Sequence, residues 1–242
     1  MKKYLLLILC MLMPSIYGCG NRQKEQLNYE TYIIPFQLTE DDSFECIQVR
    51  EMEDEQLQQK INESFMMVMP YMRSVWLPEA DYTSYETTIH LQTPKYLSVE
   101  YHFETYYAVN SLMLNSVTVG VTVDMETGET VCLDDLVRLD EEFAEYFIKK
   151  DVARREKWSV WTAEEMTELA NEIYADMGAS SVLRIFMDLS KEKESRVHEV
   201  NAKGGIYFYL EEGCLVYNHG DGLVRTRIDL KDIKDFLKVE MW

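Results

Sequence analysis

Alternating apolar and polar residues constrain the fold of this chain more than any other feature. Residues 83–104 alternate on both sides of Thr93-Pro94-Lys95, and residues 115–123 alternate with a valine at every second position. A period of two predicts strands, and a turn between two such runs predicts an antiparallel hairpin. The register in which both strands agree pairs Leu91 with Leu97, Ile89 with Val99, Thr87 with Tyr101 and Tyr85 with Phe103.

This register gives the hairpin two different faces. One face is apolar, and the other carries Glu86, Thr88, His90, Ser98, Glu100 and His102. We therefore expect a sheet that is buried on one side and solvated on the other, with the valine stretch as a further half-buried antiparallel strand.

The remaining patterns predict an α+β fold. Strands are expected over residues 29–38, 43–49, 205–209, 215–218 and 223–228. Helices are expected over residues 53–69 and 140–157. A further helix is expected after a capping box formed by Thr162 and Glu165, and a last helix from Asp229 to Leu237. We expect antiparallel sheets with helices packed on one face, in which an N-terminal half (29–110) and a C-terminal half (111–242) share one compact body.

The segment DMETGETVCLDDLV (124–137) has two interpretations, a catalytic acidic cluster or a connection between elements. Gly128 provides the positive φ that a tight reversal after Asp124 needs. Val131 and Leu133 continue the alternation, and Asp134 is placed as the N-cap of a short helix. A turn, a short strand and a capped helix account for every residue, so no catalytic role is needed.

The N-terminus predicts export and lipid anchoring. Lys2 and Lys3 precede an apolar run that is too short to cross a membrane comfortably, and Ile16-Tyr17-Gly18-Cys19 resembles a lipobox. We predict a signal peptide over 1–18, a lipid such as palmitate carried on Cys19, and a flexible tether over 19–28. The alternative is an ordinary signal cleavage that leaves Cys19 unmodified. The predicted location is the extracytoplasmic face of the cell membrane.

The chain is acidic and poor in cysteine. Its formal charge is −19, and removing Lys2 and Lys3 takes it to −21. This surface disfavours nucleic acid and favours basic partners. After Cys19 only Cys46, Cys132 and Cys214 remain, each next to an apolar residue. We expect these thiols to be buried. No Cys/His spacing suited to a metal site occurs, and we predict that the protein binds neither a metal nor a cofactor.

The order of INESF (61–65), YLSVEYHF (96–103), DMETGETVCLDDLV, IYFYLEEGCLVYN (206–218) and RIDLKDIKDFL (227–237) resembles a known extracytoplasmic domain. That domain of unknown function is shared by lysozyme-sensing anti-sigma factors and the N-terminal region of peptidoglycan deacetylases. The resemblance implies an envelope domain and, as in the anti-sigma factors, lysozyme as a partner. We expect neither a sigma-binding part nor a deacetylase domain. Residues 106–111, YYAVNS, depart from the family pattern, so no binding residue is transferred.

Catalytic signatures are weak in this sequence. The expected register places His102 opposite Glu86, which is interpreted as a solvated cross-strand pair in preference to an acid/base or metal pair. His219-Gly220-Asp221-Gly222 is interpreted as a plain turn in preference to a metal-binding one. No serine-hydrolase, zinc-protease or nucleotide-binding motif occurs, so we predict that the protein is not an enzyme.

Three functions remain as hypotheses. The first is a lipid-anchored, non-catalytic binding module for lysozyme, another basic wall-active protein or a peptidoglycan fragment. The alternatives are an envelope hydrolase that uses carboxylates with His102 or His219, and a structural lipoprotein. Loop position and aromatic content make Tyr106, Tyr107, His219 and Asp221 the candidate ligand-binding residues.

Overall fold

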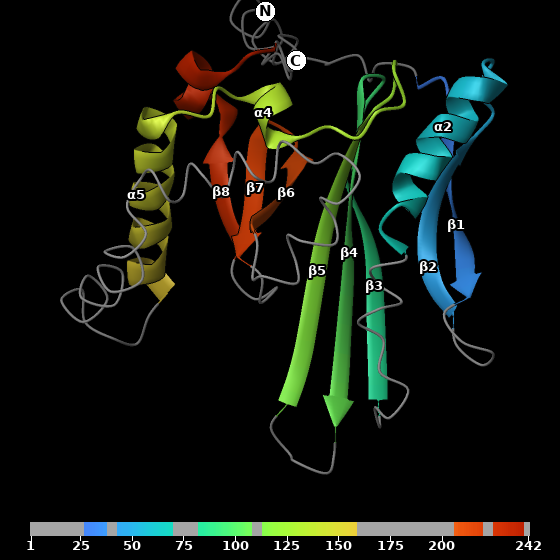
Figure 1. The fold of residues 1–242 in the computed structure, drawn as a ribbon, viewed down its shortest axis with the longest axis horizontal. Helices are drawn as coiled ribbons and strands as arrows, with labels where there is room; N and C mark the ends of the chain where they lie inside the picture. The colour runs from blue at the N-terminus through green and yellow to red at the C-terminus, as the bar shows by residue number, and fades with distance from the viewer. Residues whose placement is uncertain are drawn as a thin grey trace, which may run out of the picture.

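Three small antiparallel sheets, each built from strands that are neighbours in sequence, form the framework of the fold (Figure 1). The structure is a computed structural model that describes residues 27–37, 43–69, 82–107, 113–158, 206–219 and 225–239. The strands are β1 (Glu30–Gln37), β2 (Ser43–Arg50), β3 (Tyr82–Gln92), β4 (Tyr96–Tyr107), β5 (Met113–Asp124), β6 (Ile206–Glu211), β7 (Cys214–His219) and β8 (Arg225–Asp229). The sheet orders are β1-β2, β3-β4-β5 and β6-β7-β8.

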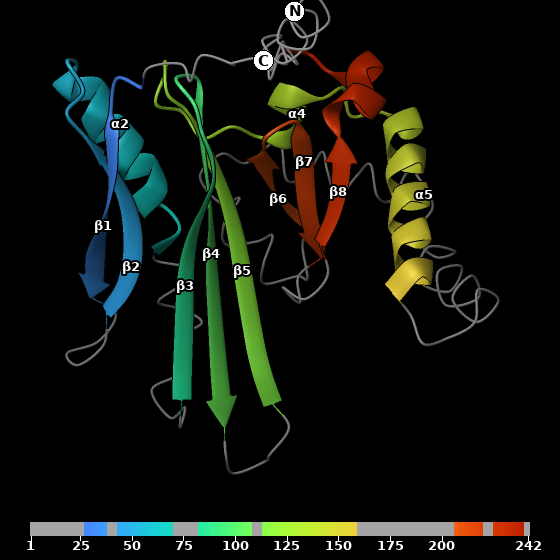
Figure 2. The same ribbon diagram turned by 180° about the vertical axis from the view of Figure 1, so that it is seen from behind.

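Helices lie beside the two outer sheets. They are α2 (Glu55–Met66), α4 (Leu133–Leu136), α5 (Glu141–Trp158) and the 3-10 helix η2 (Leu230–Phe236). Figures 1 and 2 show α2 beside β1 and β2, the long strands β3 to β5 in the middle, and α5 on the far side of β6 to β8. The expected α+β class in one compact body is confirmed. The expected helix after Thr162 lies outside the described residues.

The hairpin of β3 and β4 keeps the expected register over most of its length. Ile89 pairs with Val99, Thr87 with Tyr101, Tyr85 with Phe103 and Glu86 with His102. The expected pairing of Leu91 with Leu97 is wrong, because a bulge at His90 shifts the register and places Leu91 opposite Ser98. A one-residue shift moves a side chain to the other face of a sheet. Leu91 accordingly packs with the C-terminal core, whereas Val99 packs with the N-terminal core.

Much of the polar face on β4 and β5 is buried, which corrects the expected solvated face, whereas Glu86 on β3 is exposed. Ser98, Glu100, Thr118 and Thr122 are all buried. The backbone N–H of Leu210 in β6 donates to Ser98 Oγ at 2.9 Å, and Ser98 Oγ lies 2.7 Å from Thr122 Oγ1. The C-terminal sheet therefore covers this face, and β5 is buried on both sides instead of one.

Two main hydrophobic cores flank the central sheet. The N-terminal core joins β1, β2 and α2 to β4 and β5 around Phe44, Ile61, Phe65 and Tyr101. The C-terminal core joins β6 to β8 with α4, α5 and η2 around Phe143, Phe147, Tyr217 and Phe236. The predicted division at residue 110 falls between β4 and β5, which pair along their whole lengths; that division stays a prediction.

The segment 124–137 is a structural connection. Asp124 Oδ1 accepts from the N–H groups of Glu126 and Thr127, and Gly128 has φ 72°, as expected. Ser64 Oγ donates to the Gly128 carbonyl at 2.7 Å, so the turn docks on α2. A Cβ on Gly128 would lie 3.1 Å from the Lys60 side chain, which adds a steric reason for glycine there.

The short helix after this turn starts earlier than expected. Its N-cap is Cys132 instead of Asp134, and Leu133 is the first helical residue instead of a strand residue. Asp135 Oδ2 accepts from the Cys132 N–H at 2.8 Å, which fixes the helix start. Asp229 precedes η2 as expected, yet its carboxylate contacts Cys214 Sγ at 3.3 Å and makes no cap hydrogen bond.

The cysteines bear out the expectation of buried thiols. Cys46, Cys132 and Cys214 are all buried and free. Burial raises the pKa of Cys46 and of Cys214 above the ordinary thiol value. A raised pKa keeps a thiol protonated and unreactive, so these residues act as small core side chains.

Candidate functional site

The residues proposed from the sequence as ligand-binding fall at the margins of the described structure. Tyr106 and Tyr107 end β4 and pair with Leu114 and Met113, and His219 ends β7 opposite Ile206. Asp221 and Cys19 lie outside the described residues. Figures 1 and 2 show that β4 ends at the far tip of the long sheet and that β7 ends well short of it. The structure therefore does not bring the two candidate loops together at their strand ends.

An open groove lies beside the start of β1 and the N-terminus of α2. Its volume is about 760 Å³, and it is lined by Leu27, Asn28, Tyr29, Glu30, Glu51, Met52, Glu53, Asp54 and Leu57. Antiparallel pairing of Glu30 with Arg50 brings the two segments together. Ligand sites commonly measure about 300–1,000 Å³, so this acidic groove has the size of a binding site.

The groove combines an acidic rim with an apolar floor. Glu51, Glu53 and Asp54 are exposed, whereas Tyr29 and Met52 are buried and Leu57 is half-buried. Burial raises the pKa of Tyr29 above its ordinary value, and its hydroxyl donates to the Thr93 carbonyl at 2.8 Å. Tyr29 is therefore a neutral, fixed part of the floor.

Only part of the negative charge is balanced by neighbouring groups. Arg50 Nη2 lies 3.0 Å from Glu30 Oε2 in an exposed ion pair. Asp54 caps α2, with its Oδ1 accepting from the N–H groups of Gln56 and Leu57. Glu51 and Glu53 have no such role among the described contacts, and none of the residues that line the groove is basic. The charges of Glu51 and Glu53 therefore face solvent.

Glu51 adopts an unusual backbone conformation. Its φ is 65°, and it is the one non-glycine residue with positive φ in the described part of the chain. The left-handed region costs a non-glycine residue about 1–2 kcal/mol. Strain of this kind occurs at binding sites more often than elsewhere. Here it holds a carboxylate at the rim of the acidic groove.

The acidic groove can accept a basic side chain. Lysine and arginine bury their aliphatic stems on apolar surface while their charged ends stay hydrated or paired. Tyr29, Met52 and Leu57 provide that surface, and Glu51 and Glu53 provide the opposite charge at the rim.

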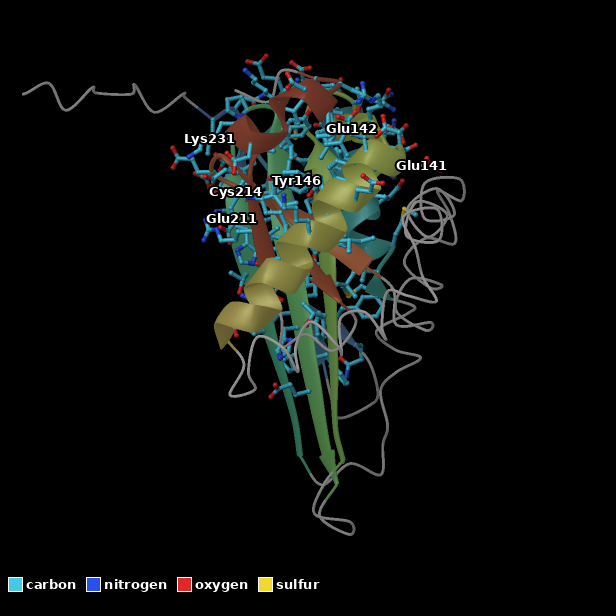
Figure 3. All side chains as sticks on the ribbon, turned by 90° about the vertical axis from the view of Figure 1, so that its left-hand side faces the viewer. Glu141, Glu142, Tyr146, Glu211, Cys214 and Lys231 are labelled. Carbon is cyan, nitrogen blue, oxygen red and sulfur yellow. The ribbon has the colours of Figure 1, made fainter. Side chains whose placement is uncertain are left out.

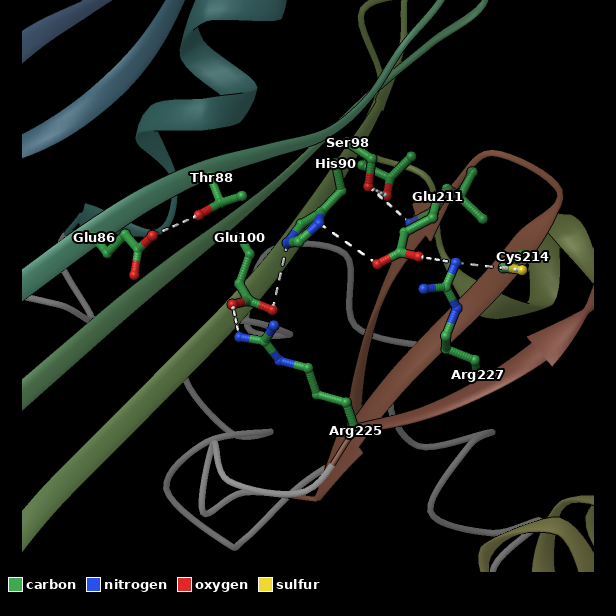
Figure 4. Close-up of polar contacts among 11 residues, drawn as sticks. Glu86, Thr88, His90, Ser98, Glu100, Glu211, Cys214, Arg225 and Arg227 are labelled. Carbon is green, nitrogen blue, oxygen red and sulfur yellow. Dashed lines mark hydrogen bonds and ion pairs between the residues drawn. The ribbon is translucent and has the colours of Figure 1, made fainter. Parts of the chain in front are cut away.

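Histidine chemistry lies elsewhere in the structure. His102 pairs with Glu86 in register, but its Nε2 lies 3.1 Å from Glu104 Oε1 and its Nδ1 lies 2.7 Å from Thr118 Oγ1. The expected His102–Glu86 contact is therefore replaced by two others. His90 lies between Glu100 and Glu211 at the junction of two sheets (Figure 4).

Three potential ligand atoms also meet at the start of α4. Single atoms of Cys132, Asp134 and Asp135 lie within 4.8 Å of one another. Asp135 already accepts the Cys132 N–H, and Lys238 Nζ donates to the Asp134 carbonyl at 2.6 Å. These contacts explain the cluster as a helix start with a neighbouring cation.

The acidic groove was not identified from the sequence, although a signal for it exists. The acidic run REMEDE (50–55) lies where the expected strand 43–49 ends and the expected helix 53–69 begins. The expected pairing of strands 29–38 and 43–49 brings residues near 30 and 50 together. Combining that pairing with the acidic run indicates an acidic surface at this position, although not its concavity.

Comparison with solved structures shows what the fold resembles. No protein-family model matches the chain, and the curated proteins contain no match either. A member of the DUF3298 family from Bacteroides fragilis is 10% identical, with a TM-score of 0.51, and the match covers 89% of this chain and 95% of that chain. A DUF3298 family protein from Pseudomonas aeruginosa is also 10% identical, covers 89% and 96%, and has a TM-score of 0.44.

The likeness to the Bacteroides fragilis protein concerns the fold. The chain has a fold similar to that of this domain of unknown function. At this identity the likeness transfers no activity and no residue role. Within the described residues, no helix has the length and apolar character needed to cross a bilayer.

Proposed function

We propose that this protein is a lipid-anchored lipoprotein of the extracytoplasmic face of the cell membrane, where it acts as a non-catalytic binding module. Its partner is a basic wall-active protein such as lysozyme, and the acidic groove is the contact surface. The observation that carries the proposal is the groove itself, an open concavity with free carboxylates over an apolar floor.

The charge of the whole chain supports the same proposal. A formal charge of −19 favours encounter with a cationic protein over long distances. Long-range attraction speeds association, whereas a fitted site provides specificity. The acidic groove supplies the fitted part, because its floor can bury an aliphatic stem while its rim pairs with the charged end. The resemblance to lysozyme-sensing domains provides the choice of lysozyme as the first partner to test.

Calorimetric titration of residues 20–242 with lysozyme tests the binding. We expect saturable one-to-one binding at low and at moderate salt. At the higher salt the association rate is lower, but the heat of binding persists. Salt screens charges that are more than about 8–10 Å apart, so contacts inside the groove persist while long-range attraction fades. Heat that disappears at moderate salt would show only general attraction between an acidic and a basic protein, and would contradict the proposed site.

The lipid anchor has a separate test. In a bacterial host that processes lipoproteins, Cys19→Ser is expected to move the protein from the membrane fraction to the soluble fraction, because it removes the thiol that carries the lipid. Cys46→Ser is the matched control, since Cys46 is buried in the folded chain and its loss leaves the anchor intact. Membrane association that is equal in wild type and Cys19→Ser contradicts the anchor.

A further inference from the structure

The sheet of β1 and β2 has two edges, and side chains cap the edge that belongs to β2. Asn62 of α2 binds both backbone groups of Val49: its Nδ2 donates to the Val49 carbonyl at 3.0 Å, and its Oδ1 accepts from the Val49 N–H at 2.7 Å. The Ile47 N–H donates to the Tyr101 hydroxyl at 3.4 Å, and the Ile47 carbonyl accepts from Gln48 Nε2 at 3.0 Å. These side chains satisfy the backbone of β2 as a neighbouring strand would.

The same contacts show which backbone groups of β1 point outward. In an antiparallel pair, opposite residues alternate between pairs that exchange both backbone hydrogen bonds and pairs that exchange none. Val49 and Ile47 direct their backbone groups away from β1, so they belong to pairs of the second kind. Their partners in β1 are Thr31 and Ile33. The N–H and C=O groups of Thr31 and Ile33 therefore point away from β2.

The outer edge of β1 is open. Within the described residues, the backbone groups of Thr31 and Ile33 have no hydrogen-bond partner, and the Ile33 side chain is 50% exposed. Figures 1 and 2 both show β1 at the margin of the ribbon. Pro35, at the next outward position, offers a carbonyl but no N–H, so the free donors lie in the first half of the strand. An edge of this kind is a template for a further strand.

The charge around this edge indicates what occupies it. β1 contains Glu30 and no basic residue, and Arg50, the one basic residue of β2, is already paired with Glu30 at 3.0 Å. The exposed Glu51 and Glu53 add negative charge beside the start of β1. Two copies of the chain, each with a formal charge of −19, repel one another, which disfavours pairing of β1 with its counterpart in a second copy. A strand that carries lysine or arginine is attracted instead.

We propose that the outer edge of β1 binds an extended basic segment of another protein by strand addition. Hydrogen bonds to the backbone groups of Thr31 and Ile33 provide the affinity, and the surrounding negative charge selects a segment with cationic side chains. This site goes beyond the acidic groove, because it takes an extended segment through backbone groups, whereas the groove is proposed to take side chains of a folded protein. The two sites are therefore tested with different ligands.

Hydrogen exchange of the full chain, followed residue by residue with nuclear magnetic resonance, tests the open edge. The probe is a synthetic peptide of alternating lysine and threonine, as long as β1 and blocked at both ends. In the free chain we expect fast exchange at the amides of Thr31 and Ile33, and slow exchange at those of Tyr32 and Ile34, which face β2. Peptide at about ten times its dissociation constant is expected to slow Thr31 and Ile33 by about tenfold.

Three outcomes of this experiment overturn the proposal. Slow exchange at Thr31 and Ile33 before peptide is added would show that the edge is already covered. Protection that grows with the concentration of the chain alone would show that a second copy occupies it. Unchanged exchange at Thr31 and Ile33 in the presence of excess peptide would show that the segment does not bind there.

Two variants at one position separate the backbone from the side chain. Ile33→Pro removes an outward N–H without removing a hydrogen bond to β2, and Pro35 already occupies an outward position of the same strand. Ile33→Ala, the matched control, keeps the N–H and removes most of the side chain. We expect Ile33→Pro to weaken peptide binding by about tenfold and Ile33→Ala by about twofold or less. Equal affinities of the two variants overturn strand addition.

A modified peptide gives an answer even if Ile33→Pro does not fold. The same peptide with a methyl group on every backbone nitrogen keeps its charge and its side chains but donates no backbone hydrogen bond. We expect it to bind the wild-type chain about tenfold more weakly or not at all. Equal affinity of the two peptides would show that charge alone attracts them, and overturns the proposal.

Discussion

Replacing Arg225 by methionine is expected to lower the free energy of unfolding by about 2–4 kcal/mol, somewhat less than the roughly 3–5 kcal/mol for breaking a fully buried ion pair. Glu100 is 2% exposed, and its Oε1 depends on Arg225 Nη2 at 2.5 Å. Methionine keeps much of the aliphatic volume but leaves the buried carboxylate without this partner. The arginine itself is 45% exposed, so solvent reduces the loss. Urea unfolding of both proteins measures the difference.

Arg138→Met is the matched control for Arg225→Met. Arg138 pairs with Asp140 and Glu142 near the start of α5, at the surface, where ion pairs contribute about 0–1 kcal/mol. A second variant, Arg225→Met with Glu100→Gln, is expected to recover part of the stability, because it no longer buries an unpaired charge. Equal losses for Arg225→Met and Arg138→Met would show that Glu100 does not depend on its arginine.

Neutralising the rim of the acidic groove is expected to weaken lysozyme binding by about tenfold or more, which corresponds to about 1.4 kcal/mol. The variant is Glu51→Gln with Glu53→Gln. Both side chains are exposed, and neither caps α2 nor pairs with a described cation, so their loss removes charge without disturbing the fold. The dissociation constant is measured by calorimetry at moderate salt.

A matched pair on the opposite side of the molecule controls for net charge. Glu141→Gln with Glu145→Gln removes the same charge from exposed positions of α5. Figure 3 shows Glu141 near the start of this helix, on its outward side. We expect this variant to keep the wild-type affinity at moderate salt. Equal weakening by both variants would mean that lysozyme senses only the total charge of the chain.

Local patterns predicted the elements well, because their causes are local. The agreement of two alternating strands gave the correct partners of Ile89, Val99 and Tyr101, and the need for positive φ identified Gly128. Strand alternation and turn chemistry act over a few residues, so one stretch of sequence contains the information. The same reasoning placed Asp124 correctly at the end of its strand, whereas it assigned the N-cap of the next helix to Asp134 instead of Cys132.

Long-range packing explains what the sequence could not provide. The polar face of β4 and β5 has the composition of a solvated surface. It is buried because β6 lies across it, through the hydrogen bond between Leu210 and Ser98, which are 112 residues apart in sequence. The bulge at His90 has the same origin, since it directs His90 and Leu91 toward that sheet. The sequence around Ser98 and His90 carries no local pattern that predicts contact with the C-terminal sheet.

The acidic groove is an intermediate case. Its two segments, residues 27–30 and 51–57, are joined by a hairpin that the sequence predicts. The groove also takes its lining from Glu51, which has a positive φ, and from the start of α2, and the predicted hairpin alone does not place either. The acidic composition was therefore visible in the sequence, whereas the concavity was not.

Hydrogen–deuterium exchange of residues 20–242, with and without lysozyme, tests the central claim most directly. The groove proposal predicts slower exchange of the backbone amides at residues 27–30 and 51–57 when lysozyme is present, with the rest of the described chain unchanged. Protection confined to the ends of β4 and β7, near Tyr107 and His219, would contradict the groove and favour the loops chosen from the sequence. An absence of protection anywhere in the chain would contradict lysozyme as the partner.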